Sequence, residues 1–120
     1  MQSSVAVAIG AVIGASTRWW IGDVLSSDGF PWATLLVNLA GCAVVGWSAI
    51  RLERGTLAWY FVVTGFLGGM TTASAFAVET RQLVDDGRVA TAITYVTVSV
   101  AGGLASVATS RHWAQRAALA

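Results

Sequence analysis

Lysine is absent from this 120-residue chain, and only 11% of its residues carry a charge. Soluble domains usually hold about 25% charged residues, so this chain has too little charge to cover a surface that faces water. Hydrophobic residues, by contrast, make up 56% of the sequence. We therefore expect residues 1–120 to form a single domain of membrane-spanning helices.

Cysteine and histidine occur once each. The single Cys42 allows no internal disulfide, and the single His112 gives no zinc-binding spacing. The sequence contains neither a nucleophile elbow nor a phosphate-binding loop, so we do not expect an enzyme. A net charge of +1 gives no reason to expect a nucleic-acid partner.

Four apolar segments are near or above the length of about 20 residues that a membrane-spanning helix needs. They are residues 4–21, 32–50, 57–84 and 89–110. The links between them are short, so consecutive helices should run antiparallel. The predicted fold class is an all-α membrane protein with four transmembrane helices.

The third segment is the longest, and the sequence GFLGGMTT lies at its middle, at residues 65–72. Glycine permits backbone angles that other residues resist, which favours a break in the helix at 68–72. Broken backbone inside a membrane is tolerated only where it is buried in protein or lines a polar cavity, and transporters often place ion sites there. The alternative is a glycine-rich contact between helices.

Basic residues are almost equally divided between the two membrane faces that this topology creates. One face holds Arg51, Arg54, Arg111 and Arg116, and the other holds Arg18, Arg81 and Arg88. Because the difference between such counts orients a membrane protein, a difference of one is a weak signal. Two hypotheses follow: a dual-topology dimer, or orientation by a partner protein.

Polar residues inside the second predicted helix share one face, because Thr34, Asn38 and Gly41 are spaced by four and three residues. Two roles fit Asn38. It makes a hydrogen bond between helices, or its NH₂ group donates to a solute in a pore.

On the first predicted helix, Gly10 and Gly14 have the spacing of a close helix contact. Arg18 follows near the membrane end, either as an interfacial anchor or as a fixed positive charge at the mouth of an anion path. Glu79 is the only carboxylate well inside a predicted span. The first and third helices run in the same direction, so Arg18 and Glu79 should lie on one side, as a salt bridge or a vestibule pair.

One face of the last predicted helix carries hydroxyls and a glycine: Thr91, Tyr95, Ser99, Gly102, Ser106 and Ser110. This face is either a packing seam of small residues or a track for a polar solute. No helix shows an acidic proton relay, which argues against a proton-coupled pump.

Three of these motifs, in this order, resemble the Fluc (CrcB) fluoride channel family. Residues 10–19 are similar to its first-helix pattern GGxxGAxxRY, with one glycine of the first pair missing and Trp19 in place of tyrosine. Residues 33–41 are similar to GTLxVNxxG, with Ala33 in place of the first glycine. Residues 65–72 match GFxGGxTT in full, and this motif is the most specific of the three.

The resemblance implies a fluoride-selective channel that exports toxic fluoride passively from the cytoplasm across the cell membrane. It also implies an antiparallel, dual-topology dimer with two pores and the third helix broken in mid-membrane. The main-chain carbonyls of Gly68 and Thr71 in each subunit would bind one structural sodium ion, which is not transported. The implied pore residues are Asn38, Ser74, Phe76, Tyr95 and Ser99, and Arg18 and Glu79 would lie in the vestibule.

The chain departs from the family pattern TTFSTF after Thr72, because Ala73 replaces the first of two phenylalanines and Ala75 replaces a threonine. In the family, the edges of those two rings face fluoride, and a ring edge is positive. An alternative is therefore a non-conducting or partner subunit that pairs with a paralogous chain. A small multidrug-type exporter is a weaker alternative, because that class depends on a carboxylate in the first helix.

Overall fold

Helices form most of the residues that the computed structural model describes, which are residues 1–25 and 29–119. The chain begins with α1 (Gln2–Val24) and α2 (Trp32–Arg51) and ends with α6 (Val89–Leu119). Between them lie α3 (Leu57–Trp59), the π-helix η1 (Tyr60–Leu67), α4 (Gly68–Met70) and α5 (Ala73–Asp85). Four segments are long and apolar enough to cross a membrane, and they are Gln2–Val24, Trp32–Arg51, Leu57–Asp85 and Val89–Leu119. The all-helical class with four such helices is therefore confirmed.

The helices differ from the expected segments mainly at their ends. The first helix continues to Val24, beyond residue 21, and α6 continues to Leu119, beyond residue 110. Hydropathy marks where a chain leaves the membrane, whereas a helix ends where a breaker or a cap stops it. No glycine or proline follows Gly103, so α6 runs on through its polar last turns.

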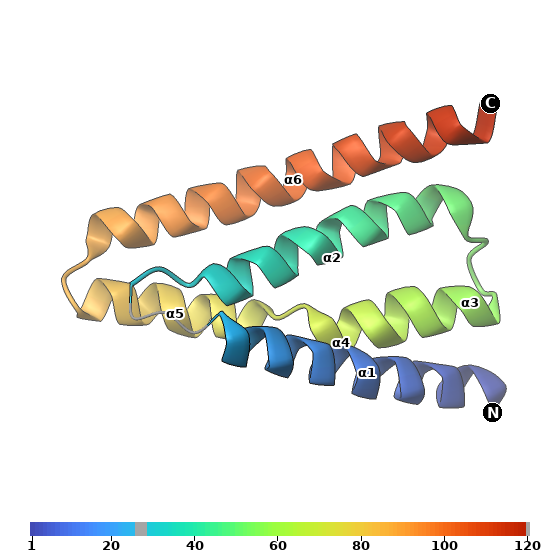
Figure 1. Cartoon of the computed structure of the whole chain (residues 1–120), viewed down its shortest axis with the longest axis horizontal. Helices are drawn as coiled ribbons and strands as arrows, with labels where there is room; N and C mark the ends of the chain where they lie inside the picture. Colours follow the sequence, from blue (N-terminus) through green and yellow to red (C-terminus); the bar gives the residue numbers. More distant parts are fainter. Residues whose placement is uncertain (26–28, 120) are drawn as a thin grey trace.

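The four membrane-length segments run antiparallel to their neighbours along the chain (Figure 1). Both chain ends lie at the right-hand end of the view, together with the link between α2 and α3. In the packing, α2 lies against α6, and α1 lies against η1 and α4. At the other end, Gly87 adopts φ 74° in the short turn between α5 and α6, which a residue with a side chain resists.

Glycines bring α1 into close contact with the third segment. A Cβ atom added to Gly14 would collide with the backbone oxygen of Phe66, and one added to Gly65 would lie 2.6 Å from the backbone oxygen of Val7. Such positions accept no side chain unless the helices move apart. The expected packing role of Gly10 and Gly14 is thus confirmed.

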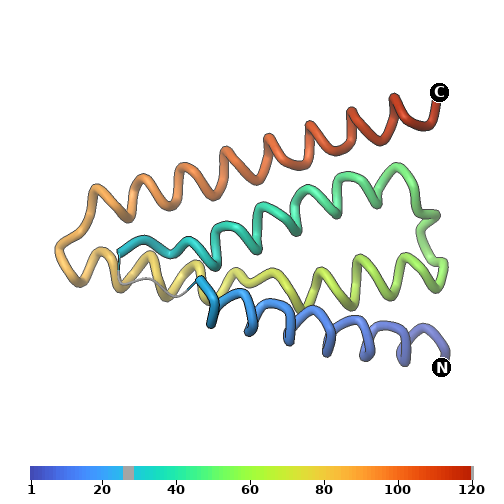
Figure 2. Tube along the Cα trace, in the orientation of Figure 1, coloured from blue at the N-terminus to red at the C-terminus, as the bar shows by residue number. Residues whose placement is uncertain are grey.

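The third segment is not one continuous helix. Thr71 and Thr72 have extended backbone angles, with ψ values of 155° and 116°, and they separate α4 from α5. The residues Gly68–Met70 before them are helical. Figure 2 shows this short straightened stretch in the yellow part of the trace, beside the middle of the molecule.

Candidate functional site

Asn38 of α2 makes two hydrogen bonds to the backbone of Thr72, at the helix interruption. The Asn38 Nδ2 atom donates to the Thr72 carbonyl at 3.1 Å, and the Thr72 N–H donates to Asn38 Oδ1 at 2.9 Å. The second bond pairs an N–H group that the interruption removes from the helical pattern. The first adds a donor to the carbonyl of Thr72, the N-cap residue of α5. The interhelical role considered for Asn38 is therefore present. The second hydrogen of its NH₂ group is a further donor.

The two threonines of the interruption use their hydroxyls differently. Thr71 Oγ1 donates to the Leu67 carbonyl at 2.9 Å and so closes the helix before the interruption. Thr72 Oγ1 accepts from the Ala75 N–H at 3.1 Å, which is the N-cap bond of α5. Thr72 Oγ1 also lies 3.1 Å from Ser74 Oγ, where either hydroxyl is the donor. A Thr-Thr pair thus ends one helix and starts the next.

Two carbonyls at the interruption lose their usual helical donors. In a continuous helix the Gly68 carbonyl would accept from the Thr72 N–H, but this group donates to Asn38. The Thr71 carbonyl would accept from the Ala75 N–H, but this group donates to the Thr72 hydroxyl. Within the described residues, the interruption therefore leaves these two oxygens without the N–H groups that a regular helix supplies.

A cavity of about 490 Å³ lies against this interruption. Asn38, Phe76 and Ser99 line it, together with Gly68, Thr71 and Ala73. Ser99 Oγ is buried and has no hydrogen-bond partner in the part of the chain that is described. The cavity therefore gathers three of the five expected pore residues around one unpaired hydroxyl. Ser74 and Tyr95 lie outside its lining.

Glu79 of α5 joins three helices through its carboxylate. Its Oε1 atom accepts from Thr34 Oγ1 of α2, and its Oε2 atom accepts from the Tyr95 hydroxyl of α6, both at 2.7 Å. Tyr95 is fully buried. Its ring contacts those of Phe76 and Phe30, with centroid distances of 5.2 and 5.5 Å. This aromatic and polar cluster adjoins the cavity through Phe76.

Arg18 occupies a different place from Glu79. It lines a cavity of about 330 Å³ together with Ala33, Thr34 and Thr72. Among the described residues Arg18 and Glu79 form no ion pair, so of the two alternatives the salt bridge is absent and the vestibule pair stays a prediction. Thr34 lines the Arg18 cavity and donates a hydrogen bond to Glu79, so it connects this cavity to the Glu79 carboxylate.

The hydroxyl face of α6 has more than one role along its length. Tyr95 and Ser99 reach Glu79 and the cavity, as described above. Farther along, a Cβ atom on Gly102 would lie 3.0 Å from Leu39, and Gly46 of α2 lies directly against Ser110. Ser110 Oγ donates to the Val107 carbonyl of its own helix at 3.1 Å. The distal half of this face is thus a packing seam.

Sequence reasoning missed the roles of Thr34 and Phe30 in this site. Thr34 shares a helix face with Asn38, which was a signal for a polar contact but did not name its partner. Phe30 lies in a link, where the apolar pattern of a helix gives no information. Its ring stands at 84° to that of Tyr95.

Comparison with known proteins gives a family match over most of the chain. Residues 5–111 match the family described as CrcB-like protein, Camphor Resistance (CrcB). The chain is 46% identical over 107 residues to a fluoride-specific ion channel FluC of Bordetella petrii, covering 86% of this chain and 84% of the relative. It is 45% identical over 102 residues to fluoride-specific ion channel FluC 2 of Rhodococcus jostii, covering 83% and 88% of the two chains. A FluC of Oceanobacillus iheyensis is 36% identical over 109 residues, covering 87% and 84%.

Proposed function

The chain belongs to the CrcB-like family of fluoride-specific ion channels, and we propose that it carries fluoride passively out of the cytoplasm across the cell membrane. The family resemblance found in the motifs is confirmed, and a channel of this family is not an enzyme. The observation that best supports a conducting role is the cavity where Asn38, Phe76 and Ser99 meet. Fluoride is small and strongly hydrated, so a channel must replace its water with hydrogen-bond donors at close range, yet release the ion.

The cavity offers such donors. The buried hydroxyl of Ser99 has no protein partner in the described chain and is free to donate to an anion. Asn38 keeps a second amide hydrogen after it binds Thr72. The edge of the Phe76 ring adds a positive quadrupole. Ser74, hydrogen-bonded to Thr72 at the start of α5, would extend this set toward the exposed face.

Glu79 would act by orienting donors. Its two oxygens hold the hydroxyls of Thr34 and Tyr95 in fixed positions beside Phe76. An anion that approaches competes with the carboxylate for these hydroxyl hydrogens, so binding stays weak enough for release. Arg18, in the cavity that Thr34 borders, would raise the local anion concentration.

The assembly we propose is an antiparallel, dual-topology dimer in which the interruption lies in mid-membrane. The near-equal division of arginines between the two faces supports insertion in both orientations. Large apolar side chains are exposed along the helices, for example Leu104 at 70% and Val12 at 67%, as expected where lipid or a second copy covers them.

Sodium would serve this dimer as a structural ion. The described residues contain no group of three or more His, Cys, Asp or Glu side chains suited to a metal. The donor set that fits is instead the pair of carbonyls of Gly68 and Thr71, which have lost their helical donors. Hard cations bind such oxygens. Two copies would supply four of them, and the ion would offset the cost of burying these groups.

Replacing sodium by a bulky organic cation during refolding tests this ion. Because each copy holds half of the donors, ion binding and dimerisation should be linked, so the dimer should weaken and fluoride flux should fall. A dimer that forms and conducts normally without an alkali cation would contradict the structural role. A sodium current that follows fluoride flux would contradict it as well.

A second candidate function follows from Ala73, which lines the cavity without an aromatic ring. The chain would then be a non-conducting or partner subunit that needs a paralogous chain to supply the ring. Replacing Ala73 by phenylalanine in a homodimer should raise fluoride flux or selectivity if the missing ring limits conduction. Unchanged flux would indicate that Phe76 and the hydroxyls suffice.

Liposomes that contain the purified chain test the main proposal. They should release fluoride, measured with a fluoride electrode, while retaining chloride. The same measurement with a co-expressed paralogous subunit separates a channel from a partner subunit. Equal chloride release, or no fluoride release in either preparation, would exclude the proposed function.

A further inference from the structure

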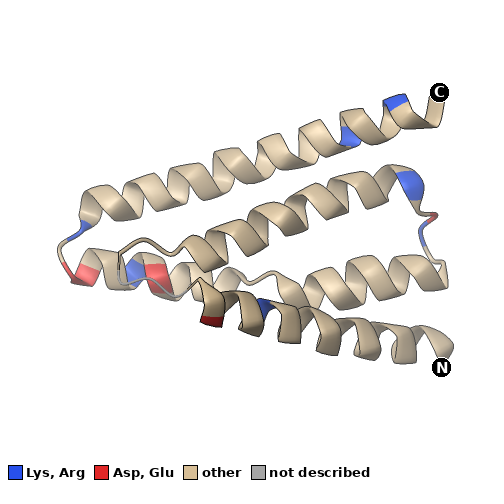
Figure 3. Cartoon of the chain, viewed as in Figure 1, with Lys and Arg blue, Asp and Glu red and all other residues tan. Residues whose placement is uncertain are grey.

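Charge is unevenly divided between the two ends of the molecule (Figure 3). The end that holds both termini, called here the basic end, carries four arginines against one glutamate. These are Arg51, Arg54, Arg111, Arg116 and Glu53. Toward the opposite end, the described residues hold three arginines against four carboxylates, which are Arg18, Arg81, Arg88, Asp23, Glu79, Asp85 and Asp86. Anionic groups in the membrane interface are therefore attracted to the basic end.

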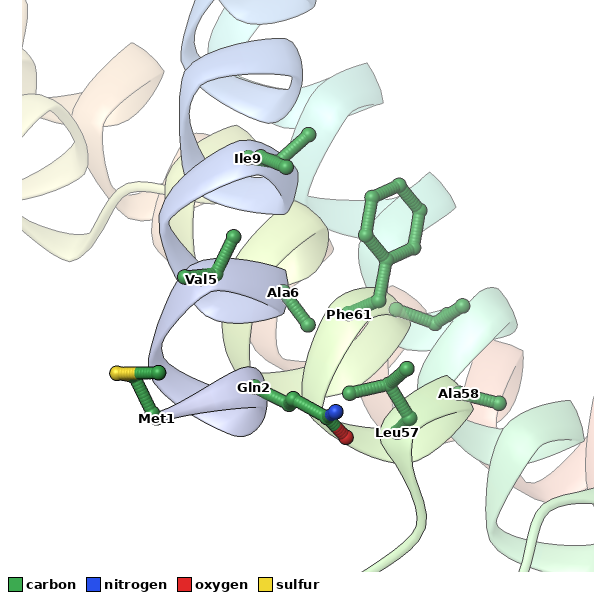
Figure 4. Close-up of a pocket in the computed structure, with 9 residues that line it drawn as sticks. Met1, Gln2, Val5, Ala6, Ile9, Leu57, Ala58 and Phe61 are labelled. Atoms are coloured by element: carbon green, nitrogen blue, oxygen red, sulfur yellow. The ribbon is translucent and has the colours of Figure 1, made fainter.

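A groove of about 580 Å³ opens beside this basic end, between α1 and the segment α3–η1 (Figure 4). Apolar side chains such as Val5, Ile9 and Phe61 line it, and Gln2 is the only polar residue of its lining. Figure 4 shows the Gln2 amide at the end of the groove beside Leu57, where α3 begins. The groove is thus apolar along its length, and its one polar group lies where the groove opens toward the basic end of the molecule.

Arg54 lies in the link that leads into this end of the groove. Its guanidinium carbon lies 5.4 Å from the centroid of the Trp59 ring, and its side chain is exposed. This cation–π contact places the charge of Arg54 beside α3, and a guanidinium carries five N–H donors in a fork that suits a phosphate. The Thr56 hydroxyl holds the link in place, because it donates to the Glu53 carbonyl at 2.7 Å and accepts from the Trp59 N–H at 3.2 Å.

We propose that this groove binds one anionic phospholipid, with an acyl chain along Val5, Ile9 and Phe61 and the phosphate at Arg54. The order of groups matches such a lipid, because an apolar groove is followed by the Gln2 amide and then by the Arg54 guanidinium. A second copy of the chain, which would bring carboxylates to the basic end, is the competing occupant that the second set of variants below separates from a lipid. The lipid site is independent of the fluoride path, since it shares no residue with the cavity at Asn38.

Native mass spectrometry of the full chain in neutral detergent tests this site with phosphatidylglycerol and phosphatidylcholine of identical acyl chains. Wild type should bind phosphatidylglycerol about fivefold more tightly, as expected for one arginine at the headgroup. Arg54→Gln should remove this preference while both lipids still bind. Arg88→Gln, at the opposite end, is the matched charge control and should keep the preference.

Variants that fill the groove with a tryptophan ring provide the second test of the lipid site. Ala6→Trp and Ala58→Trp each place a ring in the groove lining and should reduce binding of both lipids. Val12→Trp puts the same ring on α1 at an exposed position outside the groove and should bind as wild type does. The proposal is overturned if wild type shows no preference for phosphatidylglycerol, or if Val12→Trp and the groove variants lose binding equally. It is also overturned if the groove variants impair dimerisation and leave lipid binding unchanged, because a second copy then fills the groove.

Discussion

Asn38 connects α2 to the interruption of the third membrane segment, where Thr71 and Thr72 have extended backbone angles. Both of its hydrogen bonds go to the backbone of Thr72, so the side chain compensates for the interruption that shapes the cavity. A residue in this position has a structural and a conducting role at once, and a substitution affects both. Stability and flux must therefore be measured together.

Asn38→Asp is the substitution that tests this residue. The carboxylate still accepts from the Thr72 N–H but no longer donates to the Thr72 carbonyl, and it adds a negative charge to an anion cavity. The Thr72 carbonyl keeps the first intrahelical bond of α5, so the variant loses one interhelical hydrogen bond, and the free energy of unfolding should fall by about 0.5–1.5 kcal/mol. Fluoride flux should fall at least about tenfold for the folded fraction, as one repelled charge predicts. Unchanged flux from a folded variant would restrict Asn38 to a packing role.

Glu79 and Tyr95 provide a second test at this scale. Glu79→Leu leaves the fully buried Tyr95 hydroxyl without its acceptor and should cost about 1–3 kcal/mol of unfolding free energy. Tyr95→Phe should cost less in the Glu79→Leu background than in wild type, because the hydroxyl then has no partner to lose. The measurement is a double-mutant cycle of unfolding in detergent. Equal costs in both backgrounds would show that the 2.7 Å contact contributes nothing to stability.

At the scale of elements, the interruption is a joint between two helices, and each threonine belongs to one of them. The sequence motif GFLGGMTT located this joint because its glycines and threonines are unusual inside an apolar segment. It did not reveal that Gly68–Met70 are helical, nor that residues 60–67 form a π-helix. A π-helix is rare, and a run of eight mostly apolar residues gives no pattern that separates it from an α-helix. The end of α6 was missed because hydropathy does not detect a helix that continues into water.

Contacts between distant residues were the least accessible to sequence reasoning. Thr34 and Glu79 are 45 positions apart, and their pairing depends on how α2 and α5 pack. A lone carboxylate in an apolar span does signal that hydroxyl or amide donors must face it. The signal does not say which of the many hydroxyls of this chain they are. For the same reason the sequence did not distinguish a salt bridge from a vestibule pair for Arg18 and Glu79.

Thr72→Ala tests the joint. It removes the N-cap acceptor of α5 and should cost about 1 kcal/mol of unfolding free energy. Thr80→Ala is the matched control, because Thr80 donates to the Phe76 carbonyl of its own helix at 2.7 Å and caps nothing. Thr72→Ser should behave as wild type. Similar losses for Thr72→Ala and Thr80→Ala would exclude a specific capping role.

Gly14→Ala tests the contact between α1 and the third segment. The added methyl group meets the backbone of Phe66, so the helices must separate at a cost of about 1–3 kcal/mol. Gly22→Ala, on the same helix, meets nothing within 4 Å and should not destabilise the protein. Melting temperatures of the two variants provide the comparison. If Gly14→Ala melts as Gly22→Ala does, α1 packs less closely than described.

For the whole molecule, the division of charge governs both orientation and assembly. The two ends hold four and three arginines, so the positive-inside rule gives only a weak preference for one orientation. Among the described residues, all carboxylates except Glu53 lie toward the end opposite the basic end. In an antiparallel pair, the basic end of one copy lies beside the acidic end of the other. This arrangement brings opposite charges together, whereas a parallel pair would bring like charges together.

Arg81→Gln combined with Arg88→Gln tests the proposed dual topology. It leaves one arginine against four, so all copies should insert with the basic end in the cytoplasm. An antiparallel homodimer can then not form, and flux should be lost. Co-expression with a variant of opposite bias, Arg51→Gln with Arg54→Gln and Arg111→Gln, should restore it. Cysteine accessibility from each side of the membrane reports orientation, and full flux from copies of one orientation would contradict an antiparallel dimer.

The reversal potential of the purified channel in a planar bilayer is the most direct test of passive, selective fluoride conduction. With opposing gradients of fluoride, chloride and protons, we expect a current that reverses at the fluoride equilibrium potential, and this reversal potential should not shift with pH or chloride. Reversal that follows chloride or protons would contradict it, as would the absence of fluoride current from the chain both alone and with a paralogous subunit.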